Sequence, residues 1–343
     1  MSVVIIKKLP ILRIIMLELA AEYREAFMKR SFFILLMFIS VMMLTGCGNN
    51  LSRKEYTIAT GSKSGVYYPI GEVLDSILKS QYPDVTIKVI ETDGSVDNIQ
   101  MLKEGKVDMA LVQNDIAYYA CNGEAMFEGN KITNISGIAT LFPEVIQFIV
   151  RKDSDVKSLS ELAGKKIAIG GKNSGTRYNV EQILGAAGVL DKVTCINIDV
   201  KEAIEKIKTK DIDGFVFTSG LPNPSIVELS RSVEIVLLPV DLELIQKLIN
   251  KYSFYFPSTI APLQYSGQTQ ELNGLEINAV LVSGPTLSED DQYLLTKHLF
   301  NKPNELGQAH PRLSKMTKNS LRQQMPIPLG KGAHKAHMES AQQ

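Results

Sequence analysis

The chain has 343 residues, of which 45% are apolar and 22% charged, and these fractions are typical of globular proteins. A chain of this length is too long for one small hydrophobic core and suits two lobes of ordinary domain size. Its 37 basic and 37 acidic residues cancel to a formal charge of zero, which disfavours nucleic acid as a partner.

The first segment has the order of a secretory signal: a basic pair, a short apolar run and small residues at the cleavage point. Lys29 and Arg30 precede the apolar run 31–44, and the quartet LTGC occupies 44–47. About 14 apolar residues span only ~21 Å as a helix, which is short of the ~30 Å hydrocarbon core of a bilayer. The alternative interpretation is a short transmembrane anchor. Met28 is a candidate for the true start of the chain.

The LTGC quartet resembles the bacterial lipobox, in which the cysteine is lipidated and becomes the first residue of the mature protein. This resemblance implies that 1–46 is a signal peptide, that Cys47 carries acyl chains such as palmitate, and that 47–54 is a linker. Several acyl chains on one residue anchor a protein stably, whereas a single chain binds marginally. We therefore expect an extracytoplasmic lipoprotein, held at the cell membrane in a periplasm or on the outer face of a plasma membrane.

From Tyr56 onward, patterns of strands and helices alternate. Strands are predicted at 56–60, 85–90 and 108–113, and helices at 68–79 and 96–102, from the period of their apolar residues. The loop Gly61–Gly65 separates the first strand from the first helix. This βαβαβ order predicts a parallel sheet with helices over its faces.

The same rhythm restarts further along the chain. A strand at 166–170 is followed by a Gly/Ser loop and a helix at 178–187, with Gly188 as its stop signal. A strand, a helix and a further strand follow at 193–198, 201–209 and 214–218. The chain therefore contains two similar α/β units.

Two apolar segments are predicted to cross between these units. The first is 135–150, which Pro143 interrupts, and the second is 277–283, after which Ser288 caps a helix that runs through Leu299. We assign 55–145 with 277–343 to lobe 1 and 146–276 to lobe 2. Two crossovers between two lobes make a hinge with a cleft between the lobes.

Two cysteines remain after Cys47. Cys121 and Cys195 fall in different predicted lobes, where a disulfide between them would hinder closure. We therefore predict two separate, mostly buried thiols. Neither has a CxxC partner or a nearby histidine cluster, so no metal site is expected.

Several short motifs follow one another along nearly the whole mature chain. They are YYPIG at 67–71, GSVDN at 94–98, VQND at 112–115, LFPE at 141–144, NSGTR at 173–177, TSGLPNP at 218–224, and IPL at 327–329 with Gly332-Ala333. In this order and spacing, from about Tyr56 to Glu339, the sequence resembles the TAXI family, the solute receptors of one class of TRAP transporters.

The resemblance implies a fold and a role. The fold is the type II fold of periplasmic binding proteins, an α/β architecture of two parallel-sheet lobes joined by a two-strand hinge. The role is to bind a small carboxylate, such as glutamate or a dicarboxylic acid, and to deliver it to a TRAP transporter membrane permease. It implies no catalytic activity and no cofactor, and we expect a monomer.

This sequence departs from the family pattern at several places. The first loop has Ser62-Lys63-Ser64 where the family is richer in glycine, Asp93 stands where glycine is usual, and Gln147 where histidine is frequent. These three lie near the expected cleft, so they bear on the identity of the ligand. Near the end, Gly330-Lys331 replaces His-Pro, and the usual aromatic pair after Gly332-Ala333 is absent.

In parallel α/β sheets, ligands gather beyond the carboxyl ends of the strands. The loops 61–65, 93–95 and 173–176 have this position, and each opens a predicted helix. Backbone N–H groups and the helix dipole at such ends attract carboxylates or phosphates. Two such ends on opposite lobes would grip both ends of a dicarboxylate or an amino acid, and Asp93 would repel an anion or hold an ammonium group.

The candidate ligand-binding residues come from these loops and from the segments after the other strands. They are Ser64, Tyr67, Tyr68, Asp93, Gly94, Ser95, Asn98, Gln113, Asp115, Ser174, Gly175, Thr176, Arg177, Ser219, Pro222 and Asn223. An aromatic wall from one of the two tyrosines and a two-pronged grip by Arg177 are the specific roles we expect.

Ten of these residues also have a structural interpretation. Ser95, Ser174 and Thr176 are suited to capping helices, Tyr67 and Tyr68 to packing, and Gln113 and Asp115 to a hydrogen-bonded turn. Arg177 in a first helical turn is suited to solvent, and Pro222 with Asn223 to the start of a helix.

Catalytic motifs are scarce. The sequence has no GxSxG, HExxH or Walker A run, and its four histidines, His298, His310, His334 and His337, all fall near the end of the chain. An enzyme on the same two-lobed fold, such as a small transferase, would need Asp93 or Asp115 as its acid–base group. A surface sensor lipoprotein without a transporter is the third hypothesis.

Overall fold

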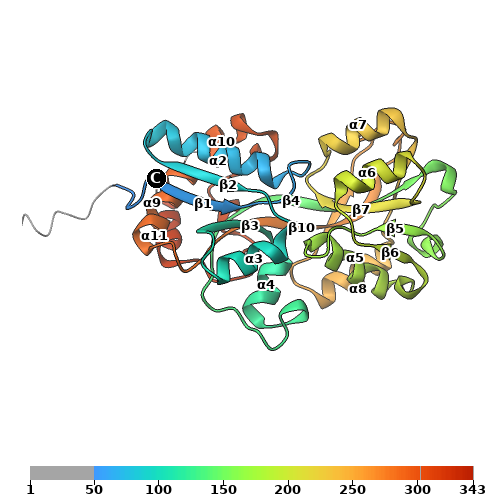
Figure 1. The fold of residues 1–343 in the computed structure, drawn as a ribbon, viewed down its shortest axis with the longest axis horizontal. Helices are drawn as coiled ribbons and strands as arrows, with labels where there is room; N and C mark the ends of the chain where they lie inside the picture. Colours follow the sequence, from blue (N-terminus) through green and yellow to red (C-terminus); the bar gives the residue numbers. More distant parts are fainter. Residues whose placement is uncertain (1–49, 302, 343) are drawn as a thin grey trace, which may run out of the picture. The chain divides into compact units, whose positions relative to one another are not determined.

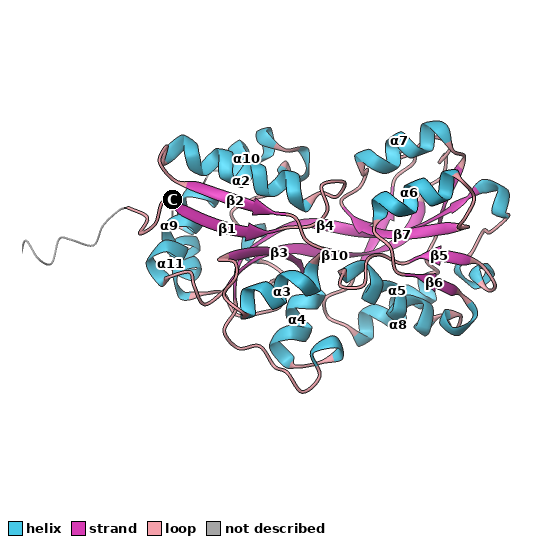
Figure 2. Cartoon of the chain, viewed as in Figure 1, coloured by secondary structure: helices cyan, strands magenta, loops and turns pink. Residues whose placement is uncertain are grey.

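One mixed sheet of ten strands organises the part of the chain that the computed structural model describes, residues 50–301 and 303–342 (Figures 1 and 2). The strands are β1 Glu55–Ala59, β2 Thr86–Ile90, β3 Met109–Gln113, β4 Ser136–Arg151, β5 Lys166–Ala168, β6 Thr194–Ile196, β7 Gly214–Ser219, β8 Ile235–Leu238, β9 Phe256–Ile260 and β10 Leu272–Ser283. The predicted signal peptide, the candidate start Met28 and the lipobox Cys47 lie outside the described residues.

Helices cover both faces of this sheet (Figure 2). They are α2 Tyr67–Gln81, α3 Ser95–Lys103, α4 Asn114–Asn122, α5 Gly175–Ala186, α6 Val200–Lys208, α7 Pro224–Ser232, α8 Leu242–Lys251, α9 Glu289–Phe300, α10 Pro303–Ala309 and α11 Lys331–Ala341. Their apolar residues recur at helical spacing: in α6, for example, Val200, Ala203 and Ile207 are buried. No helix among the described residues combines the length and the apolar character needed to cross a bilayer.

The strand order is β2-β1-β3-β10-β4-β7-β5-β6, with β8 added beside β4 and β9 beside β10. The pairs β1–β2, β1–β3, β5–β6 and β5–β7 are parallel. In contrast, β4 and β10 run antiparallel to all their neighbours. The predicted α/β fold of two parallel-sheet lobes joined by two strands is therefore confirmed. We call β1–β3 with α2–α4 the first half, and β5–β7 with α5–α7 the second half.

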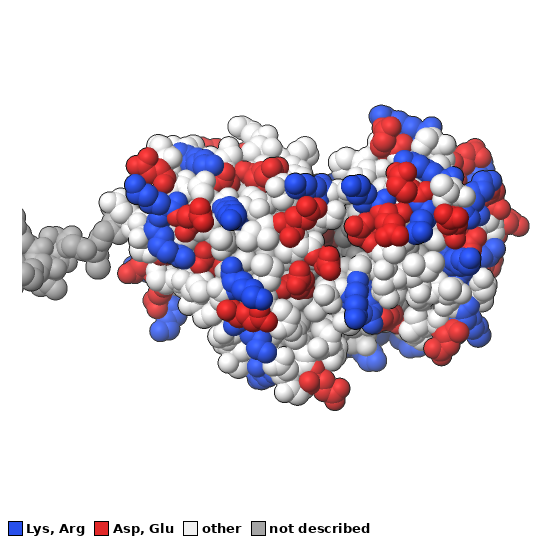
Figure 3. All heavy atoms as spheres, viewed as in Figure 1, with Lys and Arg blue, Asp and Glu red and all other residues white. Residues whose placement is uncertain are grey.

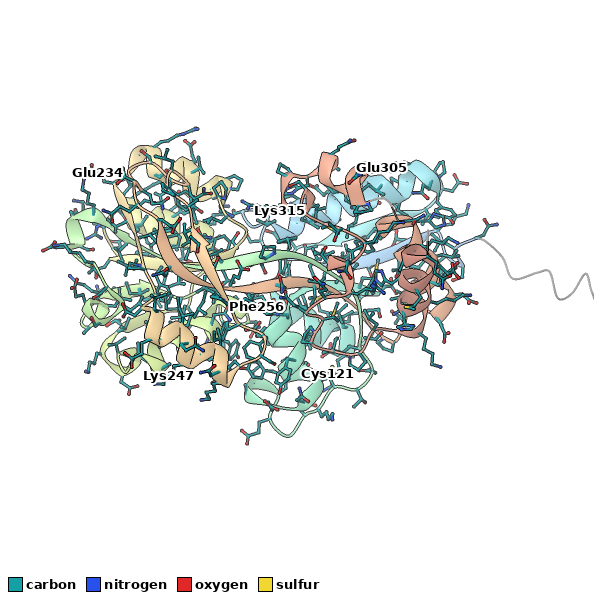
Figure 4. All side chains as sticks on the ribbon, turned by 180° about the vertical axis from the view of Figure 1, so that it is seen from behind. Cys121, Glu234, Lys247, Phe256, Glu305 and Lys315 are labelled. Carbon is teal, nitrogen blue, oxygen red and sulfur yellow. The ribbon has the colours of Figure 1, made fainter. Side chains whose placement is uncertain are left out.

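The two long strands carry the chain between the halves. β4 pairs with β10 as far as Val145 and with β7 from Val145 onward, and β10 changes its pairing at Glu276, where β9 joins it. From behind, Phe256 at the start of β9 lies between the halves (Figure 4). The lobe boundaries after Val145 and before Ile277 remain a proposal.

Pro143 does not interrupt the first crossover as its sequence suggests. β4 is continuous from Ser136 to Arg151, and Pro143 is an exposed residue within it. The register against β10 shifts between Ala279 and Val280, next to the residue that Pro143 faces. An irregularity of this kind accommodates a residue that has no N–H to donate.

The segment before β1 is tied to the first half. The backbone N–H of Ser52 donates to Asp291 Oδ1 at 2.8 Å, and Arg53 forms an ion pair with Asp108 at 2.8 Å. The end of the predicted linker 47–54 is thus held against the folded body. Elsewhere in this body, Cys121 and Cys195 are free, half-buried thiols.

Candidate functional site

A cavity of about 100 Å³ lies between the first and second halves, at the carboxyl ends of their parallel strands. This volume has room for several water molecules or a small guest. Its walls are the loop before α2, the loop before α3, the end of β3, the loop before α5, the start of α6, and parts of β4 and β7. In the space-filling view a hollow opens between the halves, with acidic side chains on both sides of it (Figure 3).

The halves touch each other over this cavity. The backbone N–H of Val96 at the start of α3 donates to the carbonyl of Asn173 at 3.1 Å. The hydroxyl of Ser225 on α7 donates to the carbonyl of Ser64 at 3.2 Å. Gly94 has a φ of +122°, and a Cβ added there would lie 3.3 Å from Cα of Ser174. Glycine therefore permits both this backbone conformation and this close approach.

Gln113 and Gly175 approach each other closely between the halves. A Cβ added to Gly175 would lie 1.9 Å from Oε1 of Gln113, so the amide occupies the space that a side chain on α5 would fill. The backbone N–H of Gln113 donates to Oγ of Ser95 at 3.0 Å, which fixes the end of β3. Among the described residues, Oε1 of Gln113 is buried without a hydrogen-bond partner. Buried acceptors in proteins normally have a hydrogen-bond donor as a partner, and no described residue donates to this one.

The helices that open at the cavity differ in how they begin. The N-cap residues of α2 and α3 are Val66 and Gly94, and neither caps its helix with a side chain. α5 and α6 are capped by the side chains of Ser174 and Asp199, which accept hydrogen bonds from N–H groups of their own helices. Free N–H groups at a helix start attract negative charge. The ends of α2 and α3 are therefore the more open positions for an anionic group.

Glu144 on β4 lies at the base of the cavity, 3% exposed. Its Oε2 accepts a hydrogen bond from the hydroxyl of Tyr67 at 2.6 Å. Burial raises the pKa of Glu144 to about 8, the Tyr67 bond opposes that rise, and the charge of Asp115 adds to it. Burial likewise raises the pKa of Tyr67 well above its usual value, so the phenol remains a neutral donor.

Asp115 lies behind the cavity wall and is fully buried. It accepts hydrogen bonds from the N–H of Ile116 at 2.8 Å and from Nδ2 of Asn179 at 2.7 Å. Burial raises its pKa to about 7, and these hydrogen bonds oppose the rise. Because Asn179 belongs to α5, this carboxyl joins the first half to the second. Asn179 also accepts from the hydroxyl of Thr218 on β7 at 2.9 Å.

The structure brings half of the predicted ligand-binding residues to the cavity. These are Tyr67, Asp93, Gly94, Ser95, Gln113, Gly175, Thr176 and Ser219. They come from both halves, as the positions of the loops beyond the strand ends predicted.

Three of the other candidates are buried in hydrogen bonds that hold the frame. Asn98 donates to the carbonyls of Thr60 and Leu111 at 2.6 and 2.7 Å. Asn223 caps α7 by accepting from the backbone N–H groups of residues 225 and 226. Asp115 makes the bonds described above. None of the three lines the cavity.

The remaining five do not line the cavity either. Ser174 caps α5, and Ser64 takes part in the contact with Ser225. Arg177 forms an ion pair with Glu181 at 2.8 Å on its own helix. Tyr68 is half-buried, with Nζ of Lys63 5.2 Å from its ring centre, and the carbonyl of Pro222 accepts from Arg312.

Sequence reasoning missed two acidic residues of the cavity wall, Glu144 and Asp199. A signal for Glu144 existed, because it is the single charged residue in the apolar segment 135–150. Asp199 stands two residues before the predicted helix 201–209, where an acid is usually a cap, and it does cap α6. Its position at the cavity mouth is a consequence of how α6 approaches the first half.

Comparison with known proteins gives one family and many similar folds. The model of the NMT1-like family matches residues 58–340. A solved protein of Bordetella bronchiseptica RB50 is 16% identical, with a TM-score of 0.50, over 84% of this chain and 83% of that one. At this identity the likeness concerns the fold.

Two sulphonate-binding proteins also match. The periplasmic aliphatic sulphonate binding protein SsuA from Escherichia coli is 14% identical with a TM-score of 0.45, over 84% of each chain. The alkanesulfonate-binding protein SsuA from Xanthomonas axonopodis pv. citri, bound to MOPS, is 14% identical with a TM-score of 0.47, over 85% of this chain and 93% of that one.

Proposed function

The chain belongs to the NMT1-like family, and from this premise we propose that it is an extracytoplasmic solute-binding lipoprotein of a TAXI-type TRAP transporter. In this role it binds a small carboxylate, such as glutamate or a dicarboxylic acid, and delivers it to a membrane permease. It acts as a monomer that clamps its ligand between two lobes.

One observation carries the proposal: the cavity is enclosed between two α/β halves that β4 and β10 join. Two strands are a narrow connection, and narrow connections are where hinge motions occur. Polar contacts cross the cavity, such as Val96 with Asn173 and Ser225 with Ser64. Such contacts are easily exchanged between an open and a closed state.

The carboxylate part of the proposal rests on the helix starts. α2, α3 and α5 begin at the cavity wall, and Ser95 and Thr176 bring hydroxyl groups to the same wall. Backbone N–H groups at helix starts bind anions without a basic side chain. A carboxylate would therefore find donors from both halves at once.

The candidate acid–base groups do not favour an enzyme. Asp115 is enclosed behind the wall and bonded to Asn179. Asp93 is exposed at the cavity mouth, and the wall includes no histidine or cysteine that would serve as its partner. We therefore propose binding without catalysis.

The lipid anchor is proposed on the LTGC quartet alone, since Cys47 lies outside the described residues. Substituting Cys47→Ser is expected to abolish acyl labelling of the expressed protein. Acyl labelling that persists in this variant would remove the lipoprotein part of the proposal and leave the binding part standing.

The binding role is tested by calorimetric titration of the purified mature protein with L-glutamate and with C4 and C5 dicarboxylates. We expect heat of binding with at least one of them, and a smaller radius of gyration in small-angle scattering when that ligand saturates the protein. Absence of heat with every amino acid and dicarboxylate tried would end the carboxylate proposal. Identical scattering curves with and without a saturating ligand would contradict the clamp.

A further inference from the structure

A buried carboxyl without a cationic partner lies in the cavity wall. Glu144 is 3% exposed, and the hydroxyl of Tyr67 is its hydrogen-bond donor. Among the described residues, no lysine, arginine or histidine forms an ion pair with it. Arg312 contributes a favourable charge from a distance, but its guanidinium donates to the carbonyls of Leu221 and Pro222.

Such a group cannot stay ionised and unpaired at low cost. Moving a carboxylate out of water is expensive unless a counter-charge and hydrogen bonds compensate for the lost hydration. One phenol hydroxyl supplies a single bond and no charge. Glu144 must therefore hold a proton or receive a positive charge from a guest in the cavity.

The rest of the cavity wall also lacks a basic side chain. Of its described residues, Glu144, Asp93 and Asp199 are the charged ones, with Glu144 at the base and the two aspartates exposed. Acidic and basic side chains both lie around the hollow at the surface (Figure 3), whereas the charged residues of the lining itself are all acidic. A concave site with charges of one sign concentrates ligands of the opposite sign.

The same wall carries positive potential where α2, α3 and α5 begin. A guest that satisfies both regions bears one negative and one positive group. The geometry points to Glu144 as the binding point for a ligand ammonium group, so that the solute is a zwitterionic amino acid and not a dicarboxylate without nitrogen. This inference rests on the proposed solute-binding function and narrows its ligand.

A metal ion is the other cation that a carboxyl could hold. Within residues 50–301 and 303–342, no group of three or more His, Cys, Asp or Glu side chains is arranged to hold one. Glu144 has an uncharged phenol as its direct partner, which is a setting for an ammonium group that supplies its own hydrogen bonds.

Proton release gives the inference a distinctive signature. The titratable and charged groups around Glu144 are Tyr67 on α2, Asp115 on α4 and Arg312 near the end of the chain. With a pKa of about 8, Glu144 is protonated in the empty cavity near neutral pH, chiefly because of burial. An ammonium group favours the ionised form, so binding releases this proton, and affinity rises with pH until about pH 8.

The test compares L-glutamate with glutarate, which has the same two carboxylates and lacks the ammonium group. Calorimetry of the purified mature protein at about pH 6, 7 and 8, in two buffers of different ionisation enthalpy, gives both the affinity and the number of protons released. We expect glutarate to bind at least about tenfold more weakly, and glutamate affinity to rise by up to about tenfold per pH unit below pH 8.

Glu144→Gln keeps the size and the hydrogen-bonding shape of the side chain and removes its charge. It is expected to weaken glutamate binding by about tenfold or more, to leave glutarate binding unweakened and to abolish proton release. The matched control is Glu276→Gln on β10, the other long strand, because Glu276 is half-buried, bonds to Ser258 and does not line the cavity. This control is expected to bind glutamate as the parent does.

The outcomes separate the inference from the function on which it rests. Glutarate binding as tightly as glutamate, or glutamate binding unaffected by Glu144→Gln in a protein that remains folded, overturns the inference and leaves the carboxylate receptor standing. Failure of these two probes and of every other amino acid and dicarboxylate tried overturns the carboxylate proposal and the inference with it. Weaker glutarate binding with proton release that Glu144→Gln removes supports both.

Discussion

The two halves of the molecule share an α/β plan but differ in how the N-termini of their helices are capped. In the second half, Ser174, Asp199 and Asn223 cap α5, α6 and α7 with their own side chains. In the first half, the N-cap residues of α2 and α3 are Val66 and Gly94, which provide no such caps. Side chains therefore satisfy some of the first N–H groups of these helices in the second half, whereas no N-cap side chain does so at α2 and α3.

Part of what completes the first half comes from across the cavity. The carbonyl of Asn173, in the loop before α5, accepts the N–H of Val96 in the first turn of α3. This bond forms only when the halves are in contact. A ligand carboxylate at the same helix starts would act in the same direction, since it also satisfies free N–H groups. Closure and ligand binding are thus expected to reinforce each other.

The largest effect that we expect concerns pH. Asp115 of the first half and Glu144 of the hinge strand have pKa values of about 7 and about 8, both raised by burial. At these two carboxyls the folded state therefore holds more protons than the unfolded state between about pH 4 and pH 8, so both groups lower the free energy of unfolding as the pH rises through this range. The fall should be on the order of a few kcal/mol.

Chemical denaturation of the ligand-free protein at about pH 5.5 and about pH 8 measures this difference. Below about pH 4 the trend reverses, because Asp108 and Asp291 have lowered pKa values in the folded state and lose their bonds on protonation. The double variant Asp115→Asn with Glu144→Gln should flatten the dependence between these two pH values. If the double variant keeps the full dependence, its source lies in other groups.

Much of this fold could be predicted from sequence, because apolar periodicity and turn residues are local signals. The alternation of strands and helices over 56–113 and 166–218 corresponds to β1–β3 and β5–β7 with their helices. The start of α5 was harder to predict. The helix begins at Gly175, three residues before the predicted start at Tyr178. The prediction began late because a glycine at this position is typical of a loop. Only the closeness of Gln113 explains why that position carries no side chain.

The cavity was predictable in place but not in detail. The rule that ligands gather beyond strand ends located the loops of both halves. It could not tell which polar side chains face the cavity and which bond to the frame, as Asn98 and Asn223 do, because tertiary contacts decide this. It also could not reveal that Glu144 is buried without a counter-charge, since burial of a strand residue depends on what packs over it.

A smaller effect is expected where the halves meet. Gly175→Ala places a methyl group 1.9 Å from Oε1 of Gln113, so the amide must move into the cavity or the halves must separate. Overpacking of this kind costs about 1–3 kcal/mol, and we expect ligand affinity to fall by about tenfold or more. Because alanine suits a helix better than glycine does, the stability of the second half itself should not suffer.

Calorimetric titration of this variant with the ligand that binds the parent gives the affinity change. Gly185→Ala is the matched control, because it makes the same change on the same helix where the nearest side-chain atom is 3.9 Å away. Adding Gln113→Ala to Gly175→Ala should relieve the overlap. Equal effects of the two glycine substitutions would show that the contact with Gln113 does not limit closure.

The smallest effect tests the difference in capping itself. Ser174→Ala and Asn223→Ala remove the caps of α5 and α7, and each should lower the free energy of unfolding by about 1 kcal/mol. The loss should be larger for Asn223, which is fully buried and also donates to Oγ of Ser219 at 3.0 Å.

The matched control is Ser80→Ala near the end of α2, an exposed hydroxyl that donates to a carbonyl of its own helix and caps no helix start. Its cost should stay below about 0.5 kcal/mol. Urea denaturation of the ligand-free protein compares the three variants. If side chains do cap the helix N-termini of the second half, the two cap variants lose stability with the cavity empty. A cost at Ser80 equal to that at Ser174 would mean that side-chain caps do not distinguish the halves, and the openness of α2 and α3 to a guest would then need another physical basis.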